Sequence, residues 1–229
     1  MYSSSTSALP TPASLKNKKI LLTAGPTYEP IDPVRFIGNH STGKMGYALA
    51  EAFARAGGQV ILVSGPTTQK AEHPAIQVIP VTTADQMYAQ VKQHADDADI
   101  LVFAAAVADY KPKEVSTVKV KKKEETLTLE LVKNVDIAKT IGQTKKPGQF
   151  TVGFALETDN EVENARAKLQ TKNLDLIVLN SLQDVGAGFK HDTNKITIIQ
   201  KDKITIFDLK PKTQVAADIV NFISERIHV

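Results

Sequence analysis

The chain has 229 residues, a length that corresponds to one large domain or two small ones. Hydrophobic residues make up 42% and charged residues 23%, which is ordinary for a globular protein and excludes a mostly disordered, fibrous or membrane-spanning chain. The absence of cysteine excludes disulfides, thiolate metal sites and cysteine nucleophiles and favours the reducing cytoplasm, while the net charge of +3 suits small polyanions better than a nucleic-acid coat.

The N-terminal segment differs in composition from the rest of the chain. Residues 1–18 are rich in serine, threonine, proline and alanine and have no apolar periodicity, so we expect a disordered tail. The segment also lacks the basic start and apolar middle of a secretory signal. We therefore expect one domain over residues 19–229, and it would be free of membrane contact.

Short apolar runs alternate with helical periods from Lys19 onward. KILLTA predicts a strand, residues 43–58 predict a helix that ends at Gly57 and Gly58, and QVILVS predicts the next strand. Further strands are expected at 76–81, 99–107, 150–156 and 174–180, and further helices at 84–95, 160–172 and the C-terminus. Strands this apolar are buried on both faces, so the fold class is α/β, a Rossmann-like, doubly wound and mostly parallel sheet.

Two antiparallel hairpins interrupt this alternation. Residues 115–132 alternate Val118 and Val120 with lysines, and then leucines with polar residues, which predicts a protruding hairpin with one apolar face. Near the C-terminus, KITIIQ and KITIFD flank a short turn and predict a second hairpin.

The loop that follows the first predicted strand leads directly into a helix N-terminus. Its segment GNHSTGKM fits the phosphate-loop pattern G-x-x-x-x-G-K-[ST] except at Met45, which replaces the hydroxyl that binds magnesium. Ser41, Thr42, Gly43 and Lys44 still offer hydroxyls, backbone N–H groups, a helix dipole and an ammonium group to an anion. The alternative is that Ser41 and Thr42 only cap the helix.

Other strand exits also carry polar groups. After the strand DILVF, Ala104, Ala105 and Ala106 allow a ligand ring to approach the backbone, and Asp109 suits a ribose hydroxyl or a magnesium ion, or else an Asx turn. Lys168 and Lys172 are four residues apart on a predicted helix and suit a triphosphate, although two solvated lysines are the alternative.

Two other function classes remain open at this point. An NAD(P)-dependent oxidoreductase of Rossmann fold is indicated only by the Tyr-x-x-x-Lys spacing of Tyr88 and Lys92, because no G-x-G-x-x-G follows the first strand. A basic nucleic-acid-binding module is indicated by the lysine series that includes Lys111, Lys113 and Lys119, although a solvated hairpin face is the commoner outcome.

Several long motifs, in order, resemble the phosphopantothenate–cysteine ligase (phosphopantothenoylcysteine synthetase) family of coenzyme A biosynthesis. They are AGPTYEPIDPVRFIGNHSTGKMG, AAVADYKP, VKVKK, LVKNVDIA, VGFALET and NARAKLQTKNLDLIVLN. The resemblance extends from Lys19 to the C-terminus and is to the free-standing bacterial form, which implies a functional link to a separate phosphopantothenoylcysteine decarboxylase. It implies that 4'-phosphopantothenate, L-cysteine and CTP are the substrates, with Mg²⁺, and that an acyl-cytidylate forms with release of pyrophosphate before cysteine displaces CMP.

The resemblance also implies roles for individual residues. Asn39 matches the asparagine that acts on the activated acyl group, and Lys119 matches a flap lysine that contacts the nucleotide phosphates. Together with Asn39, residues Ser41, Thr42, Gly43 and Lys44 would bind phosphopantothenate. The nucleotide-binding positions would be Phe103, Ala104, Ala105, Asp109, Lys119, Lys133, Asn134, Phe154, Lys168 and Lys172. Val135 stands where the family motif often has proline, and the metal ligands are not indicated.

The hairpin over residues 115–132 resembles the dimerisation flap of this family. Its apolar positions give an independent reason to expect a partner, because a row of exposed apolar side chains that the hairpin cannot bury needs one. The positions are Val118, Val120, Leu127, Leu129 and Leu131. We therefore expect a homodimer.

Overall fold

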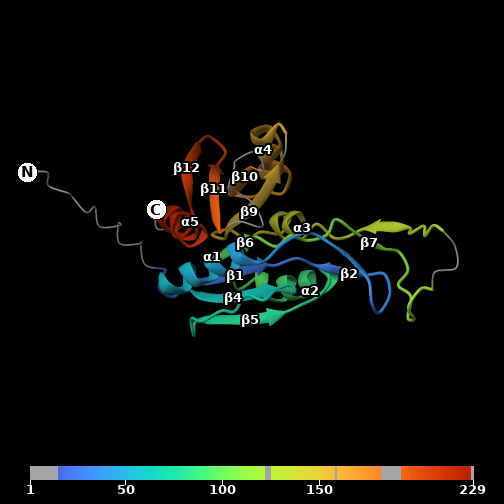
Figure 1. Cartoon of the computed structure of the whole chain (residues 1–229). Helices are drawn as coiled ribbons and strands as arrows, with labels where there is room; N and C mark the ends of the chain where they lie inside the picture. The colour runs from blue at the N-terminus through green and yellow to red at the C-terminus, as the bar shows by residue number, and fades with distance from the viewer. Residues whose placement is uncertain (1–14, 122–124, 158, 182–191, 228–229) are drawn as a thin grey trace, which may run out of the picture.

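The computed structural model describes residues 15–121, 125–157, 159–181 and 192–227 (Figure 1). The main sheet contains β1 (Lys19–Ala24), β4 (Gln59–Ser64), β5 (Ile76–Pro80), β6 (Ile100–Phe103), β9 (Phe150–Glu157), β10 (Leu176–Ser181), β11 (Thr193–Ile199) and β12 (Ile204–Pro211). Their order across the sheet is β12-β11-β10-β9-β6-β1-β4-β5. The strands from β10 to β5 are parallel to their neighbours, and β11 and β12 are antiparallel, which confirms the predicted sheet and the C-terminal hairpin.

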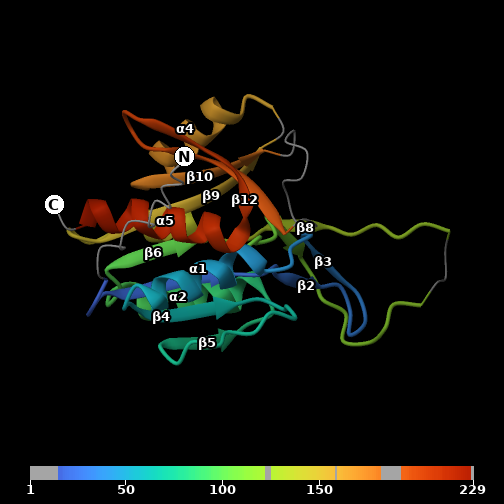
Figure 2. The same cartoon turned by 60° about the vertical axis from the view of Figure 1, so that its left-hand side comes forward.

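Helices cover both faces of the sheet (Figure 1, Figure 2). They are α1 (Lys44–Arg55), α2 (Ala84–Ala95), α3 (Ile137–Gln143), α4 (Glu161–Thr171) and α5 (Lys212–Ile227). One core contains Leu22 and packs against α1 and α5, and the other contains Leu21 and packs against α2, α3 and α4. Successive side chains of a strand point to opposite faces, so the apolar runs that predicted buried strands supply both cores.

The sheet has its topological switch point between β1 and β6. From β1 the chain passes through α1 to β4 on one side, and it returns to β6 on the other side of β1. The loops that leave these two strands lie side by side, because the Ala106 N–H donates to the Gly25 carbonyl at 2.9 Å and the Ala108 N–H donates to Thr27 Oγ1 at 2.9 Å. Ligands of doubly wound folds bind outside such a point.

Two expected boundaries are corrected by the structure. Leu15 is fully buried in the core beside α1, and its N–H donates to the Ala56 carbonyl at 2.9 Å, so the domain includes residues that we expected in the tail of residues 1–18. Residues 1–14 lie outside the described part of the chain. The strand expected at 99–107 ends at Phe103, since the following backbone turns to pair with the loop after β1.

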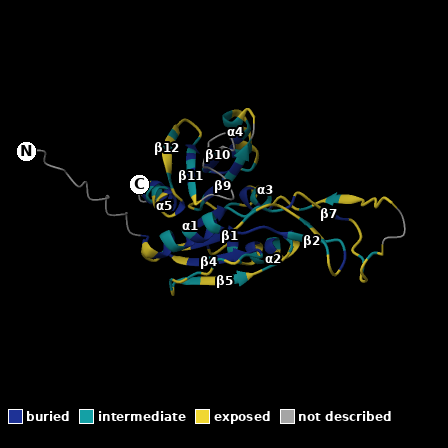
Figure 3. Ribbon diagram, viewed as in Figure 1, coloured by how far each residue is buried: buried dark blue, intermediate teal, exposed yellow. Residues whose placement is uncertain are grey.

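The flap, residues 115–132, protrudes from the domain (Figure 1). Regular pairing is limited to its base, where β7 (Tyr110–Pro112) pairs with β8 (Leu131–Lys133), so the ladder expected along the whole flap is corrected for the described residues. Residues 122–124 lie outside them. The flap is largely exposed (Figure 3), and its exposed apolar side chains include Val118, Leu127, Leu129 and Leu131, as expected.

Beside the flap, β2 (Tyr28–Pro30) and β3 (Phe36–Gly38) form a small hairpin within the long loop after β1. The rings of Tyr28 and Phe36 stack with centroids 3.9 Å apart. This hairpin was not predicted, because its strands are three residues long and the intervening prolines obscure their periodicity. It gives the long loop a fixed structure between β1 and α1.

Candidate active site

Two cavities lie at the carboxyl ends of the parallel strands, on either side of the switch point. The α1 cavity, of about 630 Å³, is lined by residues 39–46 and 104–107 and by side chains that include Phe154. The α3 cavity, of about 640 Å³, is lined by residues 107–110 and 133–139, among others. Ala105, Val107 and Phe154 line both, so these residues form the wall where the two cavities meet.

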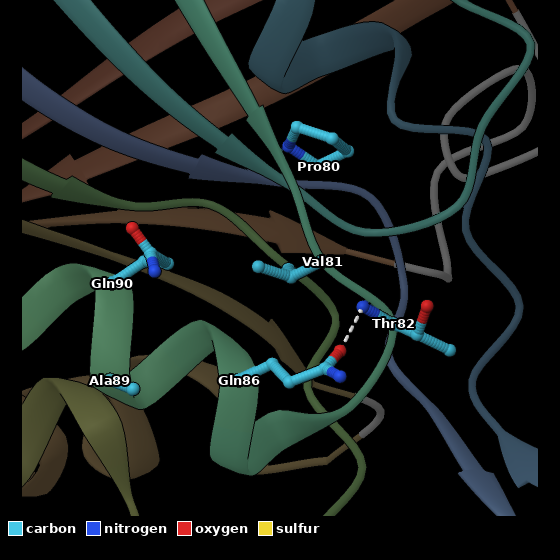
Figure 4. A pocket seen from close by; sticks show the side chains of 6 residues that line it. All are labelled: Pro80, Val81, Thr82, Gln86, Ala89 and Gln90. Atoms are coloured by element: carbon cyan, nitrogen blue, oxygen red, sulfur yellow. Dashed lines mark hydrogen bonds between the residues drawn. The ribbon is translucent and has the colours of Figure 1, made fainter.

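A third hollow, between β5 and α2, offers little chemistry (Figure 4). Its side chains are uncharged, and the carboxamide of Gln86 is engaged because Oε1 accepts the Thr82 N–H at 2.8 Å. Gln86 Oε1 also accepts the Thr83 N–H at 3.2 Å, which completes the capping box of α2.

The start of α1 forms one wall of the α1 cavity. Gly43 precedes the helix with a φ of 74°, and no side chain caps the helix. Ser41 Oγ accepts the Gly43 N–H at 3.3 Å, and the Thr42 carbonyl accepts from Thr67 Oγ1 at 2.7 Å. The alternative that Ser41 and Thr42 cap the helix is therefore wrong, and the N–H groups of the first turn are left for an anion.

Close packing holds this helix start against the end of β1. A Cβ at Gly46 would lie 2.5 Å from the Cβ of Ala24, so only glycine permits this approach. The sequence GKMG therefore brings the helix N-terminus to the strand end where the cavity opens.

Three lysines line the α1 cavity. Lys44 Nζ lies 2.5 Å from Asp192 Oδ1, and Lys168 Nζ pairs with Glu157. Lys212, the first residue of α5, is only 8% exposed, and its pKa is lowered by burial and by the charge of Lys44, an effect that Asp192 opposes. Together with the helix N-terminus, these ammonium groups suit a ligand with several negative charges.

Asn39 lies where the cavities meet. Its Nδ2 donates to the Val107 carbonyl at 3.0 Å, and Val107 lines both cavities. This bond fixes the orientation of the carboxamide, which has a second N–H for a ligand.

The α3 cavity gathers most of the expected nucleotide-binding residues. They are Phe103, Ala105, Asp109, Lys133, Asn134, Phe154 and Lys172. Asn134 connects β8 to the loop after β6, because its N–H donates to the Asp109 carbonyl and its Nδ2 to the Ala108 carbonyl, each at 2.8 Å. Its buried Oδ1 accepts no hydrogen bond. A donor on a ligand can satisfy this oxygen.

The three lysines expected to contact the nucleotide phosphates lie in different parts of the structure. Lys168 lines the α1 cavity, whereas Lys172 lines the α3 cavity and pairs with Asp136 at 2.9 Å. Lys119 is exposed on the flap and lines neither cavity of its own protomer. The spacing of residues along the sequence could not show this division.

The oxidoreductase pair does not reach the site. Tyr88 and Lys92 lie on α2, where Tyr88 packs against a core and Lys92 is exposed, and neither lines the two cavities.

An ion pair between the buried Asp32 and the partly exposed Arg35 connects the long loop after β1 to the flap. Arg35 Nε donates to Asp32 Oδ2 at 3.0 Å, and the Arg35 guanidinium also donates to the Val120 carbonyl at 3.1 Å. Hydrogen bonding to Arg35 lowers the pKa of the Asp32 carboxyl well below its usual range, against the effect of burial, and the N–H groups of Val34 and Val120 add to the lowering. Both residues fall in the first family-like motif, but their contact with the flap was not predicted.

Three further polar side chains of the α1 cavity were also missed. Asn180 ends the predicted strand LDLIVLN, so its position at a strand exit was a signal. Asn194 and Lys212 come from the C-terminal hairpin and helix, which carry no motif that would mark them.

Neither a metal cluster nor a membrane helix was found in the described part of the chain. Within residues 15–121, 125–157, 159–181 and 192–227, no three or more His, Asp or Glu side chains gather in a way that could hold a metal ion. The helices there are all too short or too polar to cross a bilayer. Magnesium bound through substrate phosphates needs only one or two carboxylates, and Asp109 in the α3 cavity fits that requirement.

The fold is a doubly wound sheet with two cavities at its switch point. An uncapped helix start and three lysines line one of them, so the chain is an α/β protein whose site suits phosphorylated ligands. Residues 15–227 match the family described as DNA/pantothenate metabolism flavoprotein C-terminal domain, and the chain belongs to that family.

Relatives and solved structures agree with this membership. A coenzyme A biosynthesis bifunctional protein CoaBC from Bacillus subtilis (strain 168) is 50% identical over 192 residues, which cover 84% of this chain and 47% of that protein. A protein named cysteine/cysteine sulfinic acid decarboxylase, from an unknown prokaryotic organism, is 49% identical over 215 residues, 93% of this chain and 60% of that protein. The chain thus spans about half to three fifths of these relatives. The crystal structure of the C-terminal domain of a CoaBC protein is 40% identical, with a TM-score of 0.81 over 94% of this chain and 98% of that one.

Proposed function

We propose that the chain is a phosphopantothenate–cysteine ligase that uses CTP. The observation that carries the proposal is the meeting of two phosphate-compatible cavities at Asn39 and Val107. In its activation step, a ligase of this kind brings two large anionic substrates, phosphopantothenate and CTP, together and needs a binding site for each, with the reacting groups in contact. Family membership and the similarity to proteins named for coenzyme A biosynthesis support the same function.

In the first step, a carboxylate oxygen of 4'-phosphopantothenate attacks the α-phosphorus of CTP. The bond from that phosphorus to the β-phosphate oxygen breaks, and pyrophosphate leaves. Ser41 to Lys44 and the start of α1 bind the phosphate of phosphopantothenate, and Lys133 and Lys172 in the α3 cavity lie toward the nucleotide. Positioning and charge neutralisation account for the rate of such transfers.

In the second step, the amine nitrogen of cysteine attacks the acyl carbon of the acyl-cytidylate. The bond from carbon to the phosphate oxygen breaks, CMP leaves, and the attacking nitrogen loses a proton. The second N–H of Asn39 donates to the oxygen on which negative charge develops, while the bond to Val107 holds the carboxamide in place.

The nucleoside portion of CTP occupies the α3 cavity in this proposal. Phe103, Ala105 and Phe154 provide an apolar surface for the ring, with Ala104 next to them in the α1 cavity. The buried Oδ1 of Asn134 accepts from a cytosine amino group or a ribose hydroxyl.

When Mg²⁺ is bound, it neutralises part of the negative charge of the triphosphate. Asp109 is the carboxylate that would hold it, or that would accept from a ribose hydroxyl, because Asp136 of the same cavity already caps α3 and pairs with Lys172.

The flap makes the functional unit a homodimer in this proposal. Lys119 lines neither cavity of its own protomer, and the apolar side chains around it are exposed. A two-fold partner covers those side chains and lets the flap complete an active site. The other partners are small-molecule substrates and, functionally, a phosphopantothenoylcysteine decarboxylase in the cytoplasm, with no role for nucleic acid.

The direct test is incubation of the chain with Mg²⁺, CTP and phosphopantothenate, with and without cysteine. We expect pyrophosphate release that depends on phosphopantothenate, and CMP and phosphopantothenoylcysteine only when cysteine is added. Unphosphorylated pantothenate and ATP are the controls. No turnover of phosphopantothenate would refute the ligase, and equal or better turnover with ATP would refute only the preference for CTP.

A further inference from the structure

One peptide group, between Val107 and Ala108, lies at the wall where the two cavities meet. Its carbonyl oxygen, that of Val107, accepts from Asn39 Nδ2 at 3.0 Å. Its N–H, that of Ala108, donates to Thr27 Oγ1 at 2.9 Å. The group is trans, and in a planar trans peptide the C=O and the N–H point in opposite directions. The Thr27 hydroxyl therefore fixes the direction of the carbonyl that holds the Asn39 carboxamide.

Thr27 is itself held firmly at the switch point. Its side chain is buried, and a β-branched side chain has few accessible rotamers. The next residue, Tyr28, donates its backbone N–H to the Thr82 carbonyl at 2.8 Å, and the preceding Pro26 forms a β-bridge with Ala106. The hydroxyl is thus a fixed acceptor for a segment that has left β6 and belongs to no strand or helix.

The same segment also holds Asn134 of the α3 cavity, but that residue depends less on Thr27. Asn134 Nδ2 donates to the Ala108 carbonyl at 2.8 Å, and its backbone N–H donates to the Asp109 carbonyl at 2.8 Å. Asn134 is half-buried, whereas Asn39 is exposed. A change at Thr27 should therefore disturb the orientation of Asn39 more than the nucleotide side of the wall.

On the basis of the proposed ligase function, we propose that Thr27 is a positioning residue, whose hydroxyl holds the Val107 carbonyl and through it the Asn39 carboxamide. Thr27 does not touch a substrate, because it is buried and lines neither cavity. A hydroxyl with a purely structural role would satisfy the buried Ala108 N–H and contribute only to stability. The two roles differ in whether the loss of the hydroxyl acts through Asn39.

A double-mutant cycle on ligase turnover separates these roles. We would measure kcat and the KM values for the unchanged chain, Thr27→Val, Asn39→Ala and the combined variant, with Thr27→Ser to restore the hydroxyl. Thr151→Val is the matched control, because Thr151 is also buried and its Oγ1 accepts the Asp175 N–H at 3.3 Å, near the amino end of β9. Thermal denaturation checks folding, and Thr27→Ala replaces Thr27→Val in the cycle if the valine variant does not fold.

We expect Thr27→Val to lower kcat by about tenfold and to change the KM for CTP by less than about twofold, with kcat restored in Thr27→Ser. In the Asn39→Ala background, Thr27→Val should lower kcat no further, because the carboxamide that it positions is already absent. Thr151→Val should lower the melting temperature and leave kcat unchanged. A full kcat in Thr27→Val, or the same loss with and without Asn39, overturns the proposal.

Nuclear magnetic resonance of the Asn39 side chain gives a readout that needs no turnover. The side-chain N–H signals of Asn39, identified by their loss in Asn39→Ala, should shift in Thr27→Val and return in Thr27→Ser. Signals that stay unchanged in Thr27→Val overturn the positioning role. Absence of ligase turnover in the unchanged chain would refute the proposed function, and these signals would then decide alone whether Thr27 positions Asn39.

Discussion

The carboxylate of Asp32 accepts a hydrogen bond from the backbone N–H of Val120 at 3.1 Å, although the two residues are 88 positions apart. Arg35 donates both to this carboxylate and to the Val120 carbonyl. The loop that carries Asn39 is therefore attached to the flap one residue from Lys119. This contact physically connects the segments that carry Asn39 and Lys119, the two residues to which the family resemblance gives catalytic roles.

Asp32→Asn should release the flap from this contact. The neutral amide keeps the shape of the carboxylate but loses the ion pair with Arg35 and part of its capacity to accept hydrogen bonds. We expect faster hydrogen exchange at the Val120 amide and about a tenfold lower ligase turnover, with the main sheet still protected. Asp96→Asn is the control, because Asp96 forms an exposed pair with Lys146 far from the flap. Unchanged exchange at Val120 would contradict the role of Asp32.

The same ion pair should make stability depend on pH. Arg35, with backbone N–H groups, lowers the pKa of the folded Asp32 carboxyl below its unfolded value of about 4. Its contribution to the unfolding free energy is therefore present above pH 4 and is lost as the pH falls below that value. Urea denaturation between about pH 3 and 6 should show a smaller acid-induced loss of stability for Asp32→Asn than for the unchanged protein. An identical pH dependence would exclude this contribution.

The periodicity of apolar residues predicted the main helices and strands, because the apolar faces that it marks are the faces that pack in the folded protein. The expected helix at 84–95 coincides with α2, where Thr83 and Gln86 form a capping box. The division of Lys168 and Lys172 between two cavities could not be predicted, since it depends on the strand order. Asn194 and Lys212 were missed for the same reason: they reach the α1 cavity only because β11 pairs with β10 in the sheet and α5 packs against one face of it.

Asn39→Asp tests the proposed catalytic carboxamide. The substitution replaces an N–H donor with a negative charge beside an anionic intermediate, and we expect turnover to fall by about a hundredfold, as for one lost oxyanion donor. Folding should be retained, because Asn39 is exposed on a loop. Asn17→Asp is the matched control in an exposed turn before β1, away from the carboxyl ends of the strands. Turnover equal to that of the unchanged protein would remove Asn39 from the mechanism.

Lys119→Gln tests the flap lysine. Glutamine retains much of the length of lysine but removes the charge, so phosphopantothenate-dependent pyrophosphate release should decrease, with the largest effect on the KM for CTP. The melting temperature should change little because Lys119 is exposed. Lys121→Gln provides a comparison within the same flap. If the two variants have the same kinetics, the special role of Lys119 is disproved.

The flap should also hold two protomers together, and this prediction connects assembly to catalysis. Val118, Leu127, Leu129 and Leu131 are exposed in the single chain, which is unfavourable unless a partner covers them. Leu127→Asp combined with Leu129→Asp places charges in that contact, so light scattering should show a monomer. Ligase activity should fall when the dimer is lost, because Lys119 then has no active site of a second protomer to reach. The control is Ile204→Asp with Ile206→Asp, since these residues are exposed on β12, away from the flap, and should leave the dimer intact. A flap variant that remains dimeric and fully active would refute both the interface and its link to catalysis.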